Sequence, residues 1–268
     1  MEPAGVITGA GETAVADGRP LDGIPAQAGP PALETVRRTG PRRLRPWLLL
    51  PTPTGTPFTF GYAAVLAVTS LYMEFAPPDA VSAALRASST DVTHLAQSPA
   101  LVLVASALWI AGGLTSPFVI AFVVVLTALE RRIGGLRTAA VFLLGHVLAT
   151  LATEVPVGLS VAAGHLPDSS LHRLDYGISF GVAASIGALA GLLTPWLRWL
   201  MLAVFAATLI QDLIAFTDPM TSWGHLLALA IGIGTWPLVR RWRRMSPSAT
   251  TSAYGRASTS ATTSPSGD

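Results

Sequence analysis

The fold of this chain is decided by residues 175–187, which read DYGISFGVAASIG. They open an apolar run, residues 177–194, of nearly the length that a membrane-spanning helix needs, which is about 20 residues. Small residues recur at intervals of four along the run, as Gly177, Gly181 and Ser185. Helices in lipid approach one another closely through such small residues. The stretch therefore predicts a membrane-embedded helix that packs tightly against a neighbour.

The composition of the whole chain agrees with a membrane protein. Of its 268 residues, 51% are hydrophobic and only 12% are charged, whereas an average soluble domain carries about 25% charged residues. A soluble enzyme is therefore disfavoured, and the absence of Cys excludes a secreted domain held together by disulfides. The net charge of +2 is too small to indicate a nucleic-acid partner.

The two ends of the chain differ from its middle. Residues 1–46 are rich in Gly, Pro, Ala and Thr, and residues 245–268 are rich in Ser and Thr. Neither segment has a hydrophobic period, so both are expected to be disordered and, in the orientation argued below, cytoplasmic. The first segment also lacks the apolar region of a signal peptide. The folded part is predicted to be one membrane domain, residues 47–244.

Apolar runs within this part predict six transmembrane helices, at residues 58–76, 116–129, 136–153, 177–194, 196–216 and 223–239. Residues 100–129 carry no charge, but one straight helix of that length would be about 45 Å long, and the bilayer core is about 30 Å thick. Gly112, Gly113 and Pro117 offer a break, so residues 100–111 are expected to form a short interfacial or half-embedded element. The fold class is thus an all-α polytopic membrane protein.

The arginines support six spans and give an orientation. Thirteen of the 15 Arg residues in or beside the membrane domain fall on one side of a six-span arrangement, and only Arg86 and Arg173 fall on the other. Positively charged loops stay in the cytoplasm, so both termini are predicted to be cytoplasmic. A multi-pass protein of the plasma membrane follows from this reading.

Two polar residues in the spans could act together. The last span has its own row of small residues, Gly224, Ala228 and Gly232, with His225 beside it. Ser179 and His225 each lie within about one turn of the outer end of their span, so close packing of the two spans would bring them together. Imidazole can take the proton that a serine must lose to act as a nucleophile. The alternative is that Ser179 bonds to its own helix and His225 is an interfacial histidine.

Other polar residues are candidates for supporting roles near Ser179 and His225. His146 lies near the middle of the third span, where it fits a buried histidine bonded to a carbonyl or a proton relay. Asp175 could orient His225, pair with Arg173, or simply favour the start of a helix. The available His, Glu and Asp residues lack metal-site spacing, so neither a metal nor another cofactor is expected. Residues 177–181 also fit G-x-S-x-G, but the hydrolase elbow of that pattern needs a preceding strand, which a spanning helix excludes.

The pattern resembles the rhomboid family of intramembrane serine proteases over residues 98–244. Glu130-Arg131-Arg132-Ile133-Gly134 matches the family's E-x-R-x-G turn after its second helix. Gly177-Ile178-Ser179 matches its G-x-S nucleophile, with Gly187 at the expected offset, and Gly224-His225 is followed by small residues as in its last helix. The resemblance implies a six-span rhomboid-like bundle with a half-embedded first loop and a Ser179–His225 dyad.

The chain also departs from that family. Phe180 replaces the usual glycine after the serine, and Leu114 and Phe118 occupy the positions of the histidine and asparagine that help bind the oxyanion. Neither Leu nor Phe donates a hydrogen bond, and one lost donor typically costs about 100- to 1000-fold in rate. Thr115 or Ser116, next to the vacated positions, could donate instead.

Three functions are therefore compared. The expected one is an intramembrane serine protease that cuts transmembrane proteins near the outer face of the bilayer. The alternatives are a rhomboid-like pseudoprotease that binds transmembrane helices without cutting them, and an unrelated small permease or assembly subunit. The expected partners are transmembrane substrates or clients and the lipid bilayer, and no nucleic acid.

Cysteine labelling tests the topology, since the native chain contains no Cys. With six spans and cytoplasmic termini, a cysteine at Ser169 reacts with an impermeant maleimide added to intact cells. A cysteine at Ser260 reacts only after the membrane is opened. The reverse pattern would exclude the six-span orientation.

Overall fold

A computed structural model describes residues 49–216 and 218–245 of the chain. Every regular element in these ranges is helical, which confirms the all-α class, and no β strand occurs in them. The predicted disordered segment 1–46 lies outside the described residues, and so does all of the predicted segment 245–268 except Met245, which ends the last helix. The helices are α1 (Pro57–Phe75), α2 (Pro78–Ala87), α3 (Val92–Gln97), α4 (Pro99–Ser106), α5 (Pro117–Ile133), α6 (Gly135–Ala162), α7 (Ser179–Ala190), α8 (Pro195–Ala215), α9 (Pro219–Gly234) and α10 (Trp236–Met245), with short 3₁₀ turns at Gly113–Thr115 and Asp168–His172.

The described helices provide three or four candidate membrane spans. By length and composition, α1, α6 and α8 are each long and apolar enough to cross a bilayer. A fourth span results if α9 and α10 are taken as one segment bent by 47°. The other two expected spans correspond to α5, of 17 residues, and α7, of 12 residues.

Some element boundaries differ from the prediction. α6 does not end near residue 153 but continues through Glu154 and Pro156, because the charge of Glu154 is paired with Arg173 at 2.5 Å. The short helices α2 and α3 were not predicted, and α3 is held by a local cap in which Asp91 accepts from the His94 N–H. Both are too short and too polar to give a hydropathy signal.

The first loop breaks where the sequence indicated. α4 begins at Pro99 and covers residues 100–106 of the expected element 100–111, and the chain then turns at Gly112 and Gly113. Both glycines have positive φ, of 80° and 67°, a conformation that side chains other than glycine rarely adopt. After this turn the chain reaches Ser116, whose side chain caps the start of α5.

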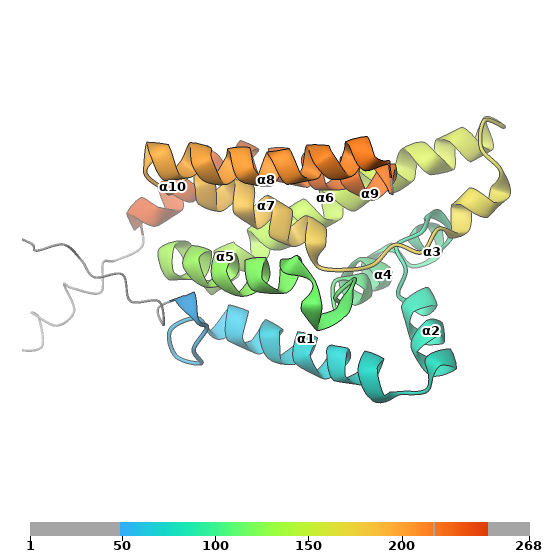
Figure 1. Cartoon of the computed structure of the whole chain (residues 1–268), viewed down its shortest axis with the longest axis horizontal. Helices are drawn as coiled ribbons and strands as arrows, with labels where there is room; N and C mark the ends of the chain where they lie inside the picture. Colours follow the sequence, from blue (N-terminus) through green and yellow to red (C-terminus); the bar gives the residue numbers. More distant parts are fainter. Residues whose placement is uncertain (1–48, 217, 246–268) are drawn as a thin grey trace, which may run out of the picture. The chain divides into compact units, whose positions relative to one another are not determined.

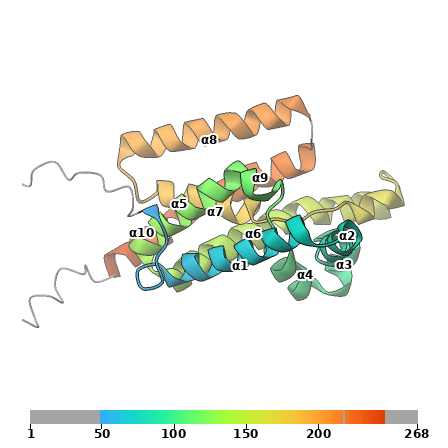
Figure 2. The same cartoon turned by 60° about the horizontal axis from the view of Figure 1, so that its bottom comes forward.

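Helix α7 lies at the centre of the bundle, in contact with α5, α6, α8 and α9 (Figures 1 and 2). Each residue from 180 to 190 is buried. The expected span 177–194 was too long, because α7 begins at Ser179 and gives way to turns after Ala190. Twelve residues give a helix of about 18 Å, well short of the bilayer core. Because residues 180–190 are all buried, neighbouring helices rather than lipid surround α7.

Small residues let α7 meet its neighbours backbone to backbone. A side chain on Gly232 of α9 would overlap the backbone of Ala184, and one on Gly187 would overlap the Leu229 carbonyl. Ala228 is fully buried in the same contact region. On another face of α7, Gly181 receives the ring of Phe142 from α6. The expected contact between the fourth and last spans is therefore present, but Gly181 packs against α6 rather than α9.

The start of α1 is capped by a buried carboxylate from α5. Glu130 accepts hydrogen bonds from the N–H groups of Phe58 and Thr59, at 3.0 and 2.7 Å, and from the Thr59 hydroxyl at 2.6 Å. The first N–H groups of a helix have no partner within it, and a negative charge there is favourable. This interaction explains the acidic residue of the E-R-R-I-G stretch.

Removal of this cap should destabilise the fold. Glu130→Ala leaves buried donors of α1 without an acceptor, which costs about 1–3 kcal/mol for each unsatisfied group. The loss is measured as a lower melting temperature in detergent. Glu74→Ala, at an exposed position near the other end of α1, serves as the control and should melt like the wild type. Equal melting of all three proteins would contradict the capping role.

Larger residues at the glycine contacts should also destabilise the protein. Gly232→Leu and Gly181→Leu force side chains into space already filled, at a cost of typically about 1–3 kcal/mol. Gly61→Leu is the matched control, because Gly61 is exposed on α1 and a Cβ there meets nothing within 4 Å. Thermal melting in detergent should separate the first two variants from the third.

Candidate functional site

A polar pocket of about 290 Å³ lies where α5, α7 and α9 begin. It is lined by Ser116 at the cap of α5, by Ser179 at the first position of α7 and by His225 near the start of α9. Asp175 and Asp218 contribute carboxylates to its wall. Because the N-terminal end of a helix carries partial positive charge, three helix ends make this pocket favourable for a developing anion.

The loop before α7 fixes the position of Ser179. Gly177 lies in this loop rather than in the helix, and its φ of 128° suits glycine. Its N–H donates to the Ser106 carbonyl at 2.9 Å, and the Ile178 N–H donates to the Trp109 carbonyl at 3.2 Å. The first loop thus holds the backbone just before Ser179, whose side chain is half-buried.

The imidazole of His225 lies between two aromatic rings. It stacks on Phe118 of α5, with ring centroids 5.1 Å apart and an angle of 20° between the planes. The ring of Phe180 meets it edge-on at 5.2 Å and fills the space beside Gly224, which has no side chain. Phe180 does not line the pocket, so the bulky residue after Ser179 leaves the pocket open.

Ser179 and His225 face the same pocket without a direct hydrogen bond. His225 Nε2 is buried and has no hydrogen-bond partner among the described residues, and within the same ranges the Ser179 hydroxyl has none either. Both groups are therefore uncommitted to other partners. Catalytic hydrogen bonds are often long before substrate binds, and the pairing of Ser179 with His225 stays a prediction.

Ser116, Tyr176 and Thr221 carry hydroxyl groups at the pocket, and the start of α7 brings a backbone N–H. Leu114 and Thr115 are exposed and do not line it, and the Thr115 hydroxyl donates to the Gly112 carbonyl at 3.3 Å. Ser116 lines the pocket and accepts from the Phe118 N–H through its oxygen, which leaves its own O–H proton available. In the described ranges, the N–H of Ser179 has no acceptor, as expected at the start of a helix.

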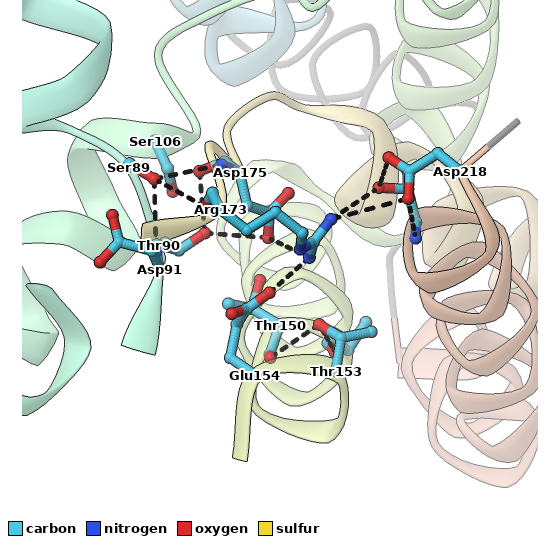
Figure 3. Close-up of polar contacts among 12 residues, drawn as sticks. Ser89, Thr90, Asp91, Ser106, Thr150, Thr153, Glu154, Arg173, Asp175 and Asp218 are labelled. Carbon is cyan, nitrogen blue, oxygen red and sulfur yellow. Dashed lines mark hydrogen bonds and ion pairs between the residues drawn. The ribbon is translucent and has the colours of Figure 1, made fainter. Parts of the chain in front are cut away.

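A cluster of charges, drawn in Figure 3, includes Asp175 and Asp218, which line the pocket. The guanidinium of Arg173 lies 2.5 Å from a Glu154 oxygen of α6, 3.7 Å from Asp218 at the cap of α9 and 4.0 Å from Asp175 in its own loop. It also donates to the Thr221 hydroxyl at 3.4 Å. Arg173 thus joins the C-terminal part of α6, the loop before α7 and the start of α9.

The charges in this cluster shift the pKa values of its loop residues. Burial raises the pKa of Asp175, even though Arg173 and Thr90 oppose that shift. Burial by itself lowers the pKa of Arg173, but the nearby carboxylates outweigh it and raise that pKa above its ordinary value. For Asp218, burial raises the pKa, and hydrogen bonds from Thr221 together with Arg173 bring it below the ordinary value. Arg173 and Asp218 are therefore both held in their charged forms.

Asp175 and His146, which the sequence suggested as supporting residues, form hydrogen bonds with groups other than Ser179 and His225. Asp175 accepts from the Thr90 hydroxyl at 3.1 Å and faces Arg173, and no hydrogen bond within the described ranges joins it to His225. His146 is buried against the first loop, with Nε2 3.1 Å from both the Ser106 hydroxyl and the Leu103 carbonyl. It does not line the pocket.

Sequence reasoning missed the wider charge cluster and the aromatic contacts. Only the pairing of Arg173 with Asp175 was considered, although a buried charge near the membrane needs a partner and Glu154 was an available one. The contact of Phe118 and Phe180 with His225 joins three separate helices, so no local pattern could indicate it.

Comparisons with known proteins give one match. A family model described as rhomboid-like protein matches residues 54–245, which is most of the chain and includes all the residues of the pocket. No curated protein matches, and no solved structure matches. The matched range begins just before α1 and ends at the last residue of α10. On this match, the chain belongs to the family of rhomboid-like proteins.

Proposed function

We propose that this chain is an intramembrane serine protease that hydrolyses peptide bonds of transmembrane proteins. The observation that carries the proposal is that Ser179 and His225, from two different helices, face one polar pocket and have no other hydrogen-bond partners within the described residues. The resemblance to rhomboid proteases supports it, since Ser179 and His225 match the positions of the dyad in that pattern. We further propose six spans in the plasma membrane with both termini in the cytoplasm.

Each step of the reaction uses a group at the pocket. Ser179 Oγ attacks the peptide carbonyl carbon while His225 takes the hydroxyl proton, so that a tetrahedral oxyanion forms. The Ser179 N–H, the Ser116 hydroxyl and the positive end of α7 stabilise this oxyanion. His225 then gives the proton to the leaving amine as the C–N bond breaks, and water hydrolyses the resulting acyl-enzyme with His225 as base.

An apolar groove beside the pocket supports a transmembrane substrate. A cavity of about 600 Å³ is bordered by α5 and α8 and shares Pro117 and Phe118 with the polar pocket. Its other lining side chains are almost all apolar, with Asp212 near the outer end of α8. An apolar segment lying in this groove would meet the polar pocket at its end, where the reactive groups are.

A pseudoprotease is the second candidate, and Phe118 favours it. This ring occupies the place of a family oxyanion donor and stacks on His225, so it both removes a hydrogen bond and restricts the imidazole. In that case the groove binds transmembrane clients that are not cut. An unrelated permease is disfavoured by the family match and by the close contact of α7 with α9.

Cleavage of a single-pass substrate in the same membrane tests the dyad. Ser179→Ala and His225→Ala should each lower cleavage by at least about 10³-fold, because loss of either residue of such a unit removes most of its rate enhancement. Ser185→Ala is the matched control on α7, since its hydroxyl donates to the Gly181 carbonyl and does not line the pocket. That variant should retain activity.

A fluorophosphonate probe separates the two candidates. The protease reading expects covalent labelling of the wild type and of Ser185→Ala, and none of Ser179→Ala. If the wild type neither reacts with the probe nor cuts any of a panel of single-pass substrates, while it still co-purifies with them, the pseudoprotease reading replaces the protease.

A further inference from the structure

A second polar cavity lies at the opposite end of α7 from the serine. Its volume is about 410 Å³, and it is formed where α7 ends, α8 begins and α10 passes by. Every ionisable side chain that lines it is an arginine, and its remaining wall is the chain just after α7. Its lining residues are Gly191, Leu192, Leu193, Arg198, Arg240, Arg243 and Arg244.

Three of the arginines are held in place by carbonyls at the end of α7. Arg198 donates to the carbonyls of Ala190 and Leu193, at 2.9 and 3.0 Å. Arg240 donates to Gly191 at 3.1 Å, and Arg243 donates to Leu192 at 3.0 Å. The last carbonyls of a helix have no partner within it, so these bonds cap α7 and fix the guanidinium groups around the cavity.

These bonds leave both charge and donors in the cavity. A guanidinium has five N–H donors, and each of these three uses only one or two of them on carbonyls. Carbonyls are dipoles and do not neutralise the four full charges. Within residues 49–216 and 218–245, no carboxylate forms an ion pair with any of the four arginines. The cavity therefore presents an uncompensated field suited to an anion.

The cavity also lies at the depth of lipid headgroups. Trp196 and Trp199, in the first turns of the membrane-length helix α8, are 69% and 62% exposed. Trp236 lies beneath two of the guanidiniums, with Arg198 and Arg240 at 5.1 and 5.0 Å from its ring. Tryptophans gather at the boundary between lipid and water, where headgroup phosphates are found.

We propose that this four-arginine cavity binds a phosphate group, and that the phosphodiester of an anionic phospholipid headgroup is its source. Arginine forks pair with phosphate oxygens through two parallel hydrogen bonds. An anionic headgroup also lacks the ammonium group of a zwitterionic lipid, which four positive charges would repel. Basic pockets between membrane helices commonly receive anionic headgroups. The proposal is independent of whether Ser179 acts as a nucleophile.

Lipid titration of the delipidated full chain in nonionic detergent tests it. Phosphatidylglycerol should raise the melting temperature at concentrations where phosphatidylcholine with the same acyl chains has little effect. Arg244→Gln should need about fivefold more phosphatidylglycerol for the same shift, as expected for loss of one arginine near a headgroup. Within the described residues Arg244 donates no hydrogen bond, so Arg244→Gln should fold like the wild type.

Arg241→Gln is the matched control. It removes the same charge from the same helix, and Arg241 is exposed and does not line the cavity. Equal weakening in the two variants, or equal responses of the wild type to the two lipids, would overturn the proposal. A shift produced by inorganic phosphate, abolished in Arg244→Gln and not increased by phosphatidylglycerol, would keep the phosphate site and identify a soluble ligand.

Discussion

The close approach of α7 to α9 is the constraint on which the site depends. Gly232 lies against the backbone of Ala184, and Gly187 lies against the Leu229 carbonyl, so neither position has room for a side chain. In lipid, such contacts supply the packing energy that hydrophobic burial supplies in water. They also set where the two helices begin relative to each other. Ser179 and His225 reach one pocket because the backbones beneath them are in contact.

The second constraint is that the backbone groups at helix ends need hydrogen-bond partners, because unpaired backbone groups are costly away from water. Glu130 caps the start of α1, and arginines from α8 and α10 cap the end of α7. Within the described residues, the N–H of Ser179 at the start of α7 is left without a partner. The carbonyls at the end of α7 therefore have hydrogen-bond partners, whereas the Ser179 N–H at its start has none among the described residues. This unpaired donor lies at the polar pocket.

Hydropathy predicted α1, α8 and the start of α6 well, because long apolar runs bounded by charges or proline leave little choice of position. It ended α6 near residue 153, whereas the helix continues to Ala162. It overestimated α7, since the small residues that make this helix apolar also let other helices enclose it, so its length need not match the bilayer. Depth, the spacing of small residues and the resemblance to the rhomboid family led to the prediction of Ser179 and His225. The partners of Arg173 and the rings around His225 come from segments far apart in the chain, and no local pattern encodes such pairs.

The length of α6 provides a depth scale for the molecule. Counted from its start at Gly135, the helix rises about 27 Å to Thr153, close to the full thickness of a hydrocarbon core. Gly224 lies beside Thr153, so, with Gly135 taken at one margin of that core, His225 would be level with the other margin and not with its centre. A bond cut by the proposed dyad would lie at the edge of a transmembrane segment, where a helix frays most readily into an extended strand.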